Sequence, residues 1–193
     1  MGARLESGFV SPLAVCLVAA VLVASPAEYT TAKAKIDQIE SDQVPGGSRV
    51  TFTPRELNSY IEQEAPMVTD GVRQPRLELW GDGVAHGTAM VNFAKLRSSE
   101  GHPPGWLMSK LLGGERPVAV TARVRSGGGQ ATVDVQRVEV SGIAIDGATL
   151  DFLIHNFLLP LYPDAVVGKP FPLGHRMDRV DVQNRGVTVT FAR

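Results

Sequence analysis

The chain has 193 residues but only one cysteine, Cys16, which lies inside an apolar run near the N-terminus. The rest of the chain therefore cannot form disulfide bonds and must be stabilised by its hydrophobic core. About 165 residues follow the run, and a chain of that length buries roughly 70% of its unfolded surface, which is enough for such a core. Lipid attachment at Cys16 is not expected, because Val15 occupies the position where lipoproteins carry a small residue.

Positive charge is not in excess, and the motifs of common enzymes are missing. The chain carries 19 Lys and Arg residues against 20 Asp and Glu, whereas a surface that binds nucleic acid normally has an excess of Lys and Arg. The sequence contains no nucleophile elbow, P-loop, dinucleotide-binding fingerprint, HExxH motif or CxxC pair. These absences predict a protein that binds no nucleic acid, uses no cofactor and is not an enzyme.

The histidines do not form a recognisable metal site. No two of them share a helix at the spacing of metal ligands, so we predict no metal, with a zinc site assembled only in three dimensions as the alternative. His155 lies one helical turn after Asp151, and a solvent-exposed contact between these residues explains the pair without a metal. The four histidines are His86, His102, His155 and His175.

An export signal is predicted in residues 1–27. An early arginine precedes an apolar run from Leu13 to Ala24, and small residues follow, which is the order of a secretory signal peptide. Cleavage is expected after Ala27. An uncleaved membrane anchor is the alternative, because residues 9–12 lengthen the apolar run. The protein is therefore expected outside the cytoplasm, in the periplasm or cell envelope, close to a membrane surface.

One domain is predicted in residues 48–193. It follows residues 28–47, which contain few bulky apolar residues and are predicted to be a polar tether or a loosely packed lead-in. The first helix of the domain should begin at Pro54, because Thr53-Pro54-Arg55-Glu56 has the form of a capping box with proline at the first helical position. The same helix should end at Pro66.

Three segments alternate between apolar and polar residues on either side of a glycine-containing turn, and each predicts a β-hairpin. They span residues 76–93, 117–145 and 177–193. In the second segment the parity of the apolar residues changes near Gln136 and again near Ser141, which predicts bulges or a strong bend in one long strand.

The stretch ATLDFLIHNFLLPLYP, residues 148–163, predicts a helix that is apolar on almost every side. Such a helix is enclosed by a curved sheet, or it borders a space that another apolar body fills. A shorter apolar helix is predicted in residues 106–112 and either completes the core or forms a rim over an apolar cavity. The predicted fold class is therefore α+β, with a strongly twisted, mostly antiparallel sheet built from hairpins and wrapped around a long apolar helix, and with two shorter helices.

The order of these elements, with FTPRELNSYI at residues 52–61 opening the domain, resembles small bacterial envelope proteins of the YpmS-like and LmeA-like kind. These look related to the tubular lipid-binding (TULIP) superfamily. The resemblance covers most of residues 50–191 in pattern, and only residues 53–61 come close to a motif. It implies a twisted sheet around a long helix, with a groove that takes acyl chains. No ligand-contact motif of the family matches this sequence residue by residue.

The export signal, the surplus of apolar helix surface and the missing catalytic motifs predict a non-enzymatic extracytoplasmic protein that holds or transfers a lipid-like apolar molecule at the membrane surface. An envelope scaffold or assembly factor is the alternative; its core would be filled, and it would contact a protein partner through residues 166–171 and the helix at Trp106. A hydrolase is a third hypothesis, which no Ser-His or Cys-His motif supports. The candidate lining residues for the apolar ligand are Trp106, Leu107, Leu111, Phe152, Leu159 and Phe171.

Overall fold

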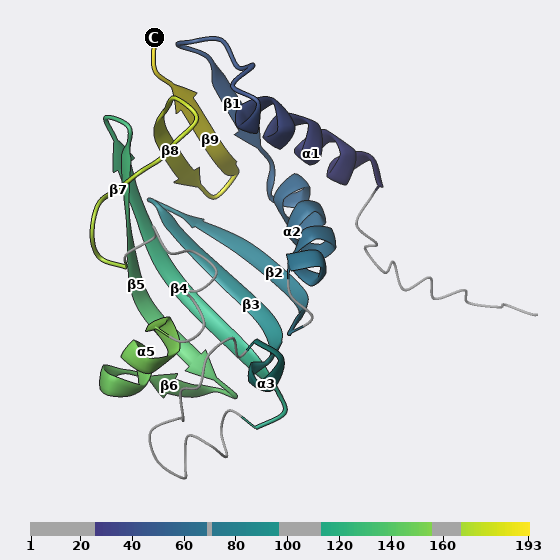
Figure 1. Cartoon of the computed structure of the whole chain (residues 1–193), viewed down its shortest axis with the longest axis vertical. Helices are drawn as coiled ribbons and strands as arrows, with labels where there is room; N and C mark the ends of the chain where they lie inside the picture. The colour runs from purple at the N-terminus through teal and green to yellow at the C-terminus, as the bar shows by residue number, and fades with distance from the viewer. Residues whose placement is uncertain (1–25, 69–70, 97–112, 156–166) are drawn as a thin grey trace, which may run out of the picture.

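Two antiparallel sheets form the framework of the protein in the computed structural model, which describes residues 26–68, 71–96, 113–155 and 167–193 (Figure 1). The larger sheet contains, in spatial order, β2 (Val72–Gly81), β3 (Val84–Asn92), β4 (Glu115–Gly127), β5 (Gln130–Val140) and β6 (Ile143–Ile145). A short strand, β7 (Phe171–Pro172), pairs with the start of β5. The smaller sheet contains, in spatial order, β1 (Arg49–Phe52), β9 (Gly186–Phe191) and β8 (Met177–Gln183).

The helices lie at two places around these sheets. Helix α2 (Pro54–Val68) runs beside β2, at one edge of the larger sheet, and α1 (Pro26–Glu40) lies against α2 and the smaller sheet (Figure 1). The short helices α3 (Phe93–Leu96) and α5 (Gly147–Leu153) lie at the end of the larger sheet that is remote from the smaller sheet (Figure 1). The α+β class with a mostly antiparallel sheet is therefore confirmed, whereas α1 and α3 were not predicted.

Helix α2 begins at the predicted residue because its capping box forms. The Thr53 backbone N–H donates to Glu56 Oε2 at 2.7 Å, and the Glu56 N–H donates to Thr53 Oγ1 at 3.2 Å. The predicted end of the helix is wrong, since Pro66 lies inside α2 and the helix continues to Val68. Proline so close to the end removes only one helical hydrogen bond, and the last turn tolerates that loss.

Residues 28–47 do not form the predicted tether. Most of this segment belongs to α1, which packs against α2, and Ala32, Ile39 and Val44 are buried. The apolar residues are few, but Ala32, Ile36 and Ile39 recur at helical spacing and therefore share one face. A narrow stripe of this kind is enough to bury a helix against a neighbour that is already in place.

Lys35 links α1 to α2 and to β1. Its Nζ donates to Glu56 Oε1 at 2.7 Å and to the Thr51 carbonyl oxygen at 2.7 Å, and it lies 5.5 Å from the centre of the Phe52 ring. Burial raises the pKa of the Glu56 carboxyl, but the hydrogen bonds from Lys35 and Thr53 lower it by more, so this pKa lies below its ordinary value. Glu56 is therefore a buried carboxylate with a full set of partners.

The three predicted hairpins are present, with two differences. The parity change at Gln136 is a bulge, because the register between β4 and β5 shifts beside Thr121. At Ser141, however, the chain does not bend within one strand. Ser141 and Gly142 both have positive φ, and they form a tight turn from which β6 returns antiparallel to β5. The third hairpin, β8 and β9, belongs to the smaller sheet because β9 pairs with β1.

The smaller sheet docks on one end of the larger sheet through backbone hydrogen bonds and one serine. The Gly83 N–H donates to the Val182 carbonyl oxygen at 3.0 Å. Ser126 Oγ donates to the Val180 carbonyl oxygen at 2.6 Å and accepts from the Val180 N–H at 2.8 Å. Gly83 is needed here because its φ is +80° and a Cβ would collide with the carbonyl oxygen of Val124.

Two clusters of buried side chains hold the fold. One lies where α3 and α5 meet the larger sheet and contains Val91, Phe93, Val138, Val140, Ile145 and Leu153. The other joins α1 to the smaller sheet and contains Ile39, Val44, Phe52, Val189 and Phe191. The second cluster explains why residues 28–47 are part of the domain, since Ile39 and Val44 supply two of its five members.

We predict that Glu56→Gln lowers the free energy of unfolding by about 1–3 kcal/mol at pH 7, because Lys35 loses its charged partner. The pKa of Glu56 is lower in the folded protein, so the carboxylate stabilises the fold fully above the unfolded pKa of about 4.3, and this contribution is lost as the pH falls through the folded value. Urea unfolding at pH 7 and in acid should therefore show a smaller pH dependence in Glu56→Gln than in the wild type.

The control variant is Asp37→Asn, whose partner Lys33 lies on the solvent-exposed side of α1. Exposed pairs contribute little, so Asp37→Asn should change the free energy of unfolding by less than about 0.5 kcal/mol. Equal losses in the two variants would contradict the role given to Lys35 and Glu56.

We predict that Ser59→Ala stabilises the protein by about 1 kcal/mol. The Ser59 side chain on α2 is 1% exposed, and its Oγ has no hydrogen-bond partner among the described residues. Replacement by alanine removes the cost of burying this hydroxyl and favours the helix. Thermal and urea unfolding measure the change, and a lower melting temperature in Ser59→Ala would mean that the hydroxyl has a partner.

Candidate functional site

The larger sheet has one apolar face and one polar face. Along β4 the residues Val118, Val120, Ala122 and Val124 point to one side, whereas Thr121, Arg123 and Arg125 point to the other, because successive side chains of a strand alternate. The strand register extends this division to the neighbouring strands. We call the first side the apolar face; on β3 and β5 it comprises Ala85, Gly87, Ala89, Val91, Ala131, Val133, Val135, Val138 and Val140.

The bulge at Gln136 keeps the apolar face continuous. Val133 and Val138 are five residues apart, so they would point to opposite faces in a regular strand. In the observed register Val133 lies opposite Val124 and Val138 lies opposite Val120, and all four side chains therefore share one face. The parity change that the sequence shows near Gln136 thus extends one apolar face instead of dividing it.

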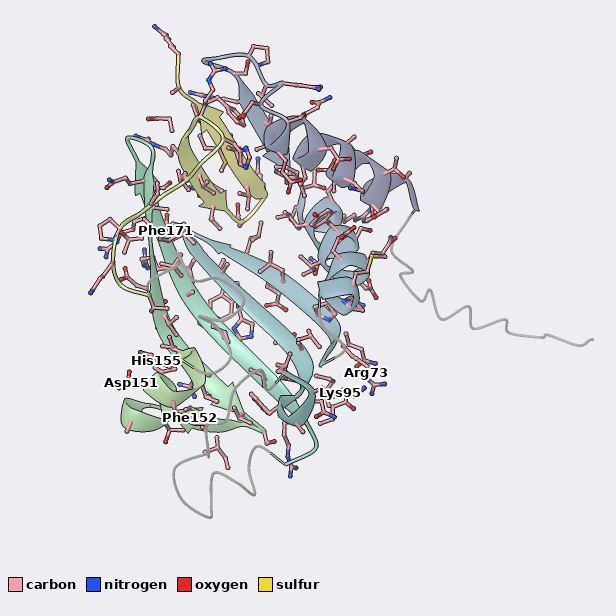
Figure 2. All side chains as sticks on the ribbon, in the orientation of Figure 1. Arg73, Lys95, Asp151, Phe152, His155 and Phe171 are labelled. Atoms are coloured by element: carbon pink, nitrogen blue, oxygen red, sulfur yellow. The ribbon has the colours of Figure 1, made fainter. Side chains whose placement is uncertain are left out.

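Two of the six predicted lining residues lie at opposite ends of this face. Phe152 of α5 packs against the cluster that contains Val140, at the end of β5. Phe171 of β7 lies opposite Ala131, at the start of β5. Figure 2 shows this separation. From Ala131 to Val140 the strand spans about 30 Å, so Phe152 and Phe171 lie on the same face without contacting each other. Four predicted lining residues lie outside the described ranges: Trp106, Leu107, Leu111 and Leu159.

The described residues cover the two halves of the apolar face differently. At the end near α5, Phe93, Ile145 and Leu153 are buried against Val138 and Val140. At the other end, Val124 and Val133 are half-buried and belong to neither cluster of buried side chains. Nearer Phe171, Ala131 is buried, and Ser126, which shares this face, bonds to Val180 of β8. Among the described residues, the least covered part of the face therefore lies around Val124 and Val133, and we call it the free part.

The predicted long apolar helix is described only at its start. Helix α5 begins at Gly147, after Asp146, and its buried residue is Leu153. The predicted contact between Asp151 and His155 forms, but the His155 Nδ1–H donates to the backbone carbonyl oxygen of Asp151, at 2.8 Å, and not to its carboxylate. Both side chains are exposed (Figure 2). Residues 156–163 of the predicted helix lie outside the described ranges.

His86 lies on the polar face, within a group that the sequence analysis did not single out. Its ring stacks on that of Trp80, with 4.8 Å between the ring centres and 10° between the planes. Its Nδ1 is hydrogen-bonded to Thr121 Oγ1 at 2.9 Å. The sequence could have placed Trp80 on the polar face. It comes directly after the buried Leu79 and two residues after Glu78, so it points to the same side as Glu78.

The described part of the chain contains no group of three or more His, Cys, Asp and Glu residues that could hold a metal ion. Within the same residues, no helix combines the length and the apolar character that crossing a membrane requires. Comparisons of the chain with protein-family models, with curated proteins and with solved structures found no match.

Proposed function

We propose that the protein is a non-enzymatic, extracytoplasmic binder of a lipid-like molecule, and that the acyl chain of this ligand lies along the apolar face. The observation that carries the proposal is the continuity of this face along β4 and β5, from Phe171 at one end to Phe152 at the other. The predicted export signal and the resemblance to the TULIP superfamily support the same function. We propose that the membrane surface supplies the ligand.

About half the length of the apolar face is enough for one acyl chain. The hydrocarbon core of a bilayer is about 30 Å thick, so one chain reaches about 15 Å, and the face is about twice as long. On β3 the face carries only the small residues Ala85, Gly87 and Ala89. Larger side chains line both sides of them, so the apolar face is indented along β3. Each buried methylene contributes about 0.8 kcal/mol, which offsets the loss of translational freedom once several are in contact.

The proposed site also includes the long apolar helix that the sequence predicts. The apolar pattern that begins in α5 continues through residue 161, and we propose that this long helix lies against the apolar face and that the sheet wraps around it. Helix and sheet would then form the two walls of the acyl-chain site. The residues at 106–112 would form its rim.

An envelope scaffold with a filled core is the second candidate function. The observation in its favour is that Phe93 and Leu153 already cover the part of the apolar face around Val138 and Val140. If the remaining part of the face is filled in the same way, no acyl chain can enter, and a protein partner takes the place of the lipid.

We predict that Val133→Asp weakens uptake of a fluorescent fatty acid at least tenfold, because a carboxylate in the free part of the apolar face would have to be desolvated. The matched control is Thr132→Asp, which places the same carboxylate on the polar face one residue earlier, opposite Arg125. Thr132→Asp should bind the fatty acid as the wild type does. Circular dichroism and thermal unfolding check that both variants are folded.

Native mass spectrometry of the full chain purified from its own host, followed by lipid extraction, is the companion measurement. The proposal predicts a co-purifying lipid in the wild type and less of it in Val133→Asp. No co-purifying lipid and no fatty-acid uptake by the wild type would favour the scaffold, and cross-linking should then recover a protein partner.

A further inference from the structure

Trp80 is an exposed aromatic ring that its neighbours hold in one orientation. Its side chain is 55% exposed, although large aromatic residues are normally buried. One side of the indole stacks on His86, and Nε1–H donates to Glu78 Oε2 at 3.1 Å. Thr121, which is 8% exposed, holds the His86 ring from below through its hydrogen bond to Nδ1. The opposite side of the indole is therefore presented to solvent as a fixed, flat platform.

Next to the platform, the polar face carries two rows of side chains, of which all but Ala119 are polar. Glu78, His86, Thr121 and Arg137 are register partners on β2 to β5, so they form one row across the polar face. A second row is formed by the residues two positions away on each strand, about 7 Å along the strands. The second row consists of Arg76, Thr88, Ala119 and Glu139.

The second row is the floor of a hollow of about 530 Å³. Gln74 lies at one side, and Glu62 of α2 forms a wall. Helix α2 is held in this position by Asn58, whose side-chain amide donates to the Leu77 carbonyl oxygen and accepts from the Leu77 N–H, both at 2.8 Å. These two bonds close the edge of β2 and place Glu62, one turn later, beside the hollow. The volume is within the range of about 300–1,000 Å³ that is usual for ligand sites.

The hollow is lined by apolar residues, among them Met90 and Pro117, as well as by polar ones, which suits a neutral ligand that carries both C–H surfaces and hydroxyl groups. Glu62 and Glu139 accept hydrogen bonds, Arg76 donates them, and Gln74 and Thr88 do both. Glu139 is already paired with Arg137 within the polar face. A phosphate or another anion would need a surplus of basic residues, which this face lacks. A quaternary ammonium group would need several aromatic rings and would meet Arg76.

We propose that the polar face binds a neutral oligosaccharide, with one sugar ring on the open side of Trp80 and a further ring of the same chain in the hollow, across the row that contains His86 and Thr121. The C–H groups of a pyranose carry partial positive charge and are attracted to the negative face of an aromatic ring. The hydroxyl groups both donate and accept, which matches the mixed lining. This site lies on the opposite face of the strands from the apolar face, so it goes beyond the proposed lipid binding and is tested independently of it.

Calorimetry with the full chain tests this site, with cellotetraose, maltotetraose and chitotetraose as probes and with sorbitol and choline as controls. At least one tetrasaccharide should bind, whereas sorbitol, which has no ring to stack, should not. Trp80→Ala should weaken this binding at least tenfold, and Arg76→Gln should weaken it measurably. Met67→Ala is the matched control, since Met67 is also an exposed apolar residue, 75% exposed, but lies near the end of α2 away from Trp80. It should bind as the wild type does.

Three outcomes would overturn the saccharide site: no tetrasaccharide binds the wild type, Trp80→Ala binds as tightly as the wild type, or only choline binds. Thermal unfolding confirms that Trp80→Ala is folded, and Arg76→Gln provides a second readout if it is not. Val133→Asp should keep its saccharide binding while it loses fatty-acid uptake. Failure of one site is thus distinguishable from failure of the other.

Discussion

The alternation of side chains along β4 and β5 is the constraint on which the rest of the structure depends. Because successive residues of a strand point to opposite sides, the valines of these two strands make one face and their charged neighbours make the other. The bulge at Gln136 preserves this division past a point where the parity of the sequence changes. Without it, Val138 and Val140 would turn toward solvent, and α5 would have no surface to pack on.

Side chains that bond to backbone groups hold the other elements in place around this sheet. Asn58 pairs with both backbone groups of Leu77 and so fixes α2 along β2, while Ser126 does the same to Val180 and so fixes the smaller sheet on the end of β4. Lys35 then ties α1 to the capping box of α2. The two faces of the larger sheet differ in chemistry, with an aliphatic surface on one and, on the other, an exposed aromatic ring and a hollow lined by polar and apolar residues.

Local patterns predicted much of the fold. The hairpins followed from alternation and glycine turns, and the start of α2 followed from Thr53 and Glu56, since each of these depends on residues close in sequence. The predictions that were wrong depend on contacts between residues far apart in the sequence. Residues 28–47 look like a tether because their few apolar residues gain burial only against α2, β1 and β9. The exposure of Trp80 likewise depends on which elements leave the polar face uncovered.

Photo-cross-linking tests the central claim, that the apolar face holds an acyl chain, most directly. A fatty acid with a diazirine on its chain is bound to the full-length protein and irradiated, and the labelled residues are located by peptide mass spectrometry. The account predicts labels on the side chains of the apolar face, above all in the free part around Val124 and Val133. Labels confined to the polar face around Trp80, or no saturable labelling at all, would contradict it.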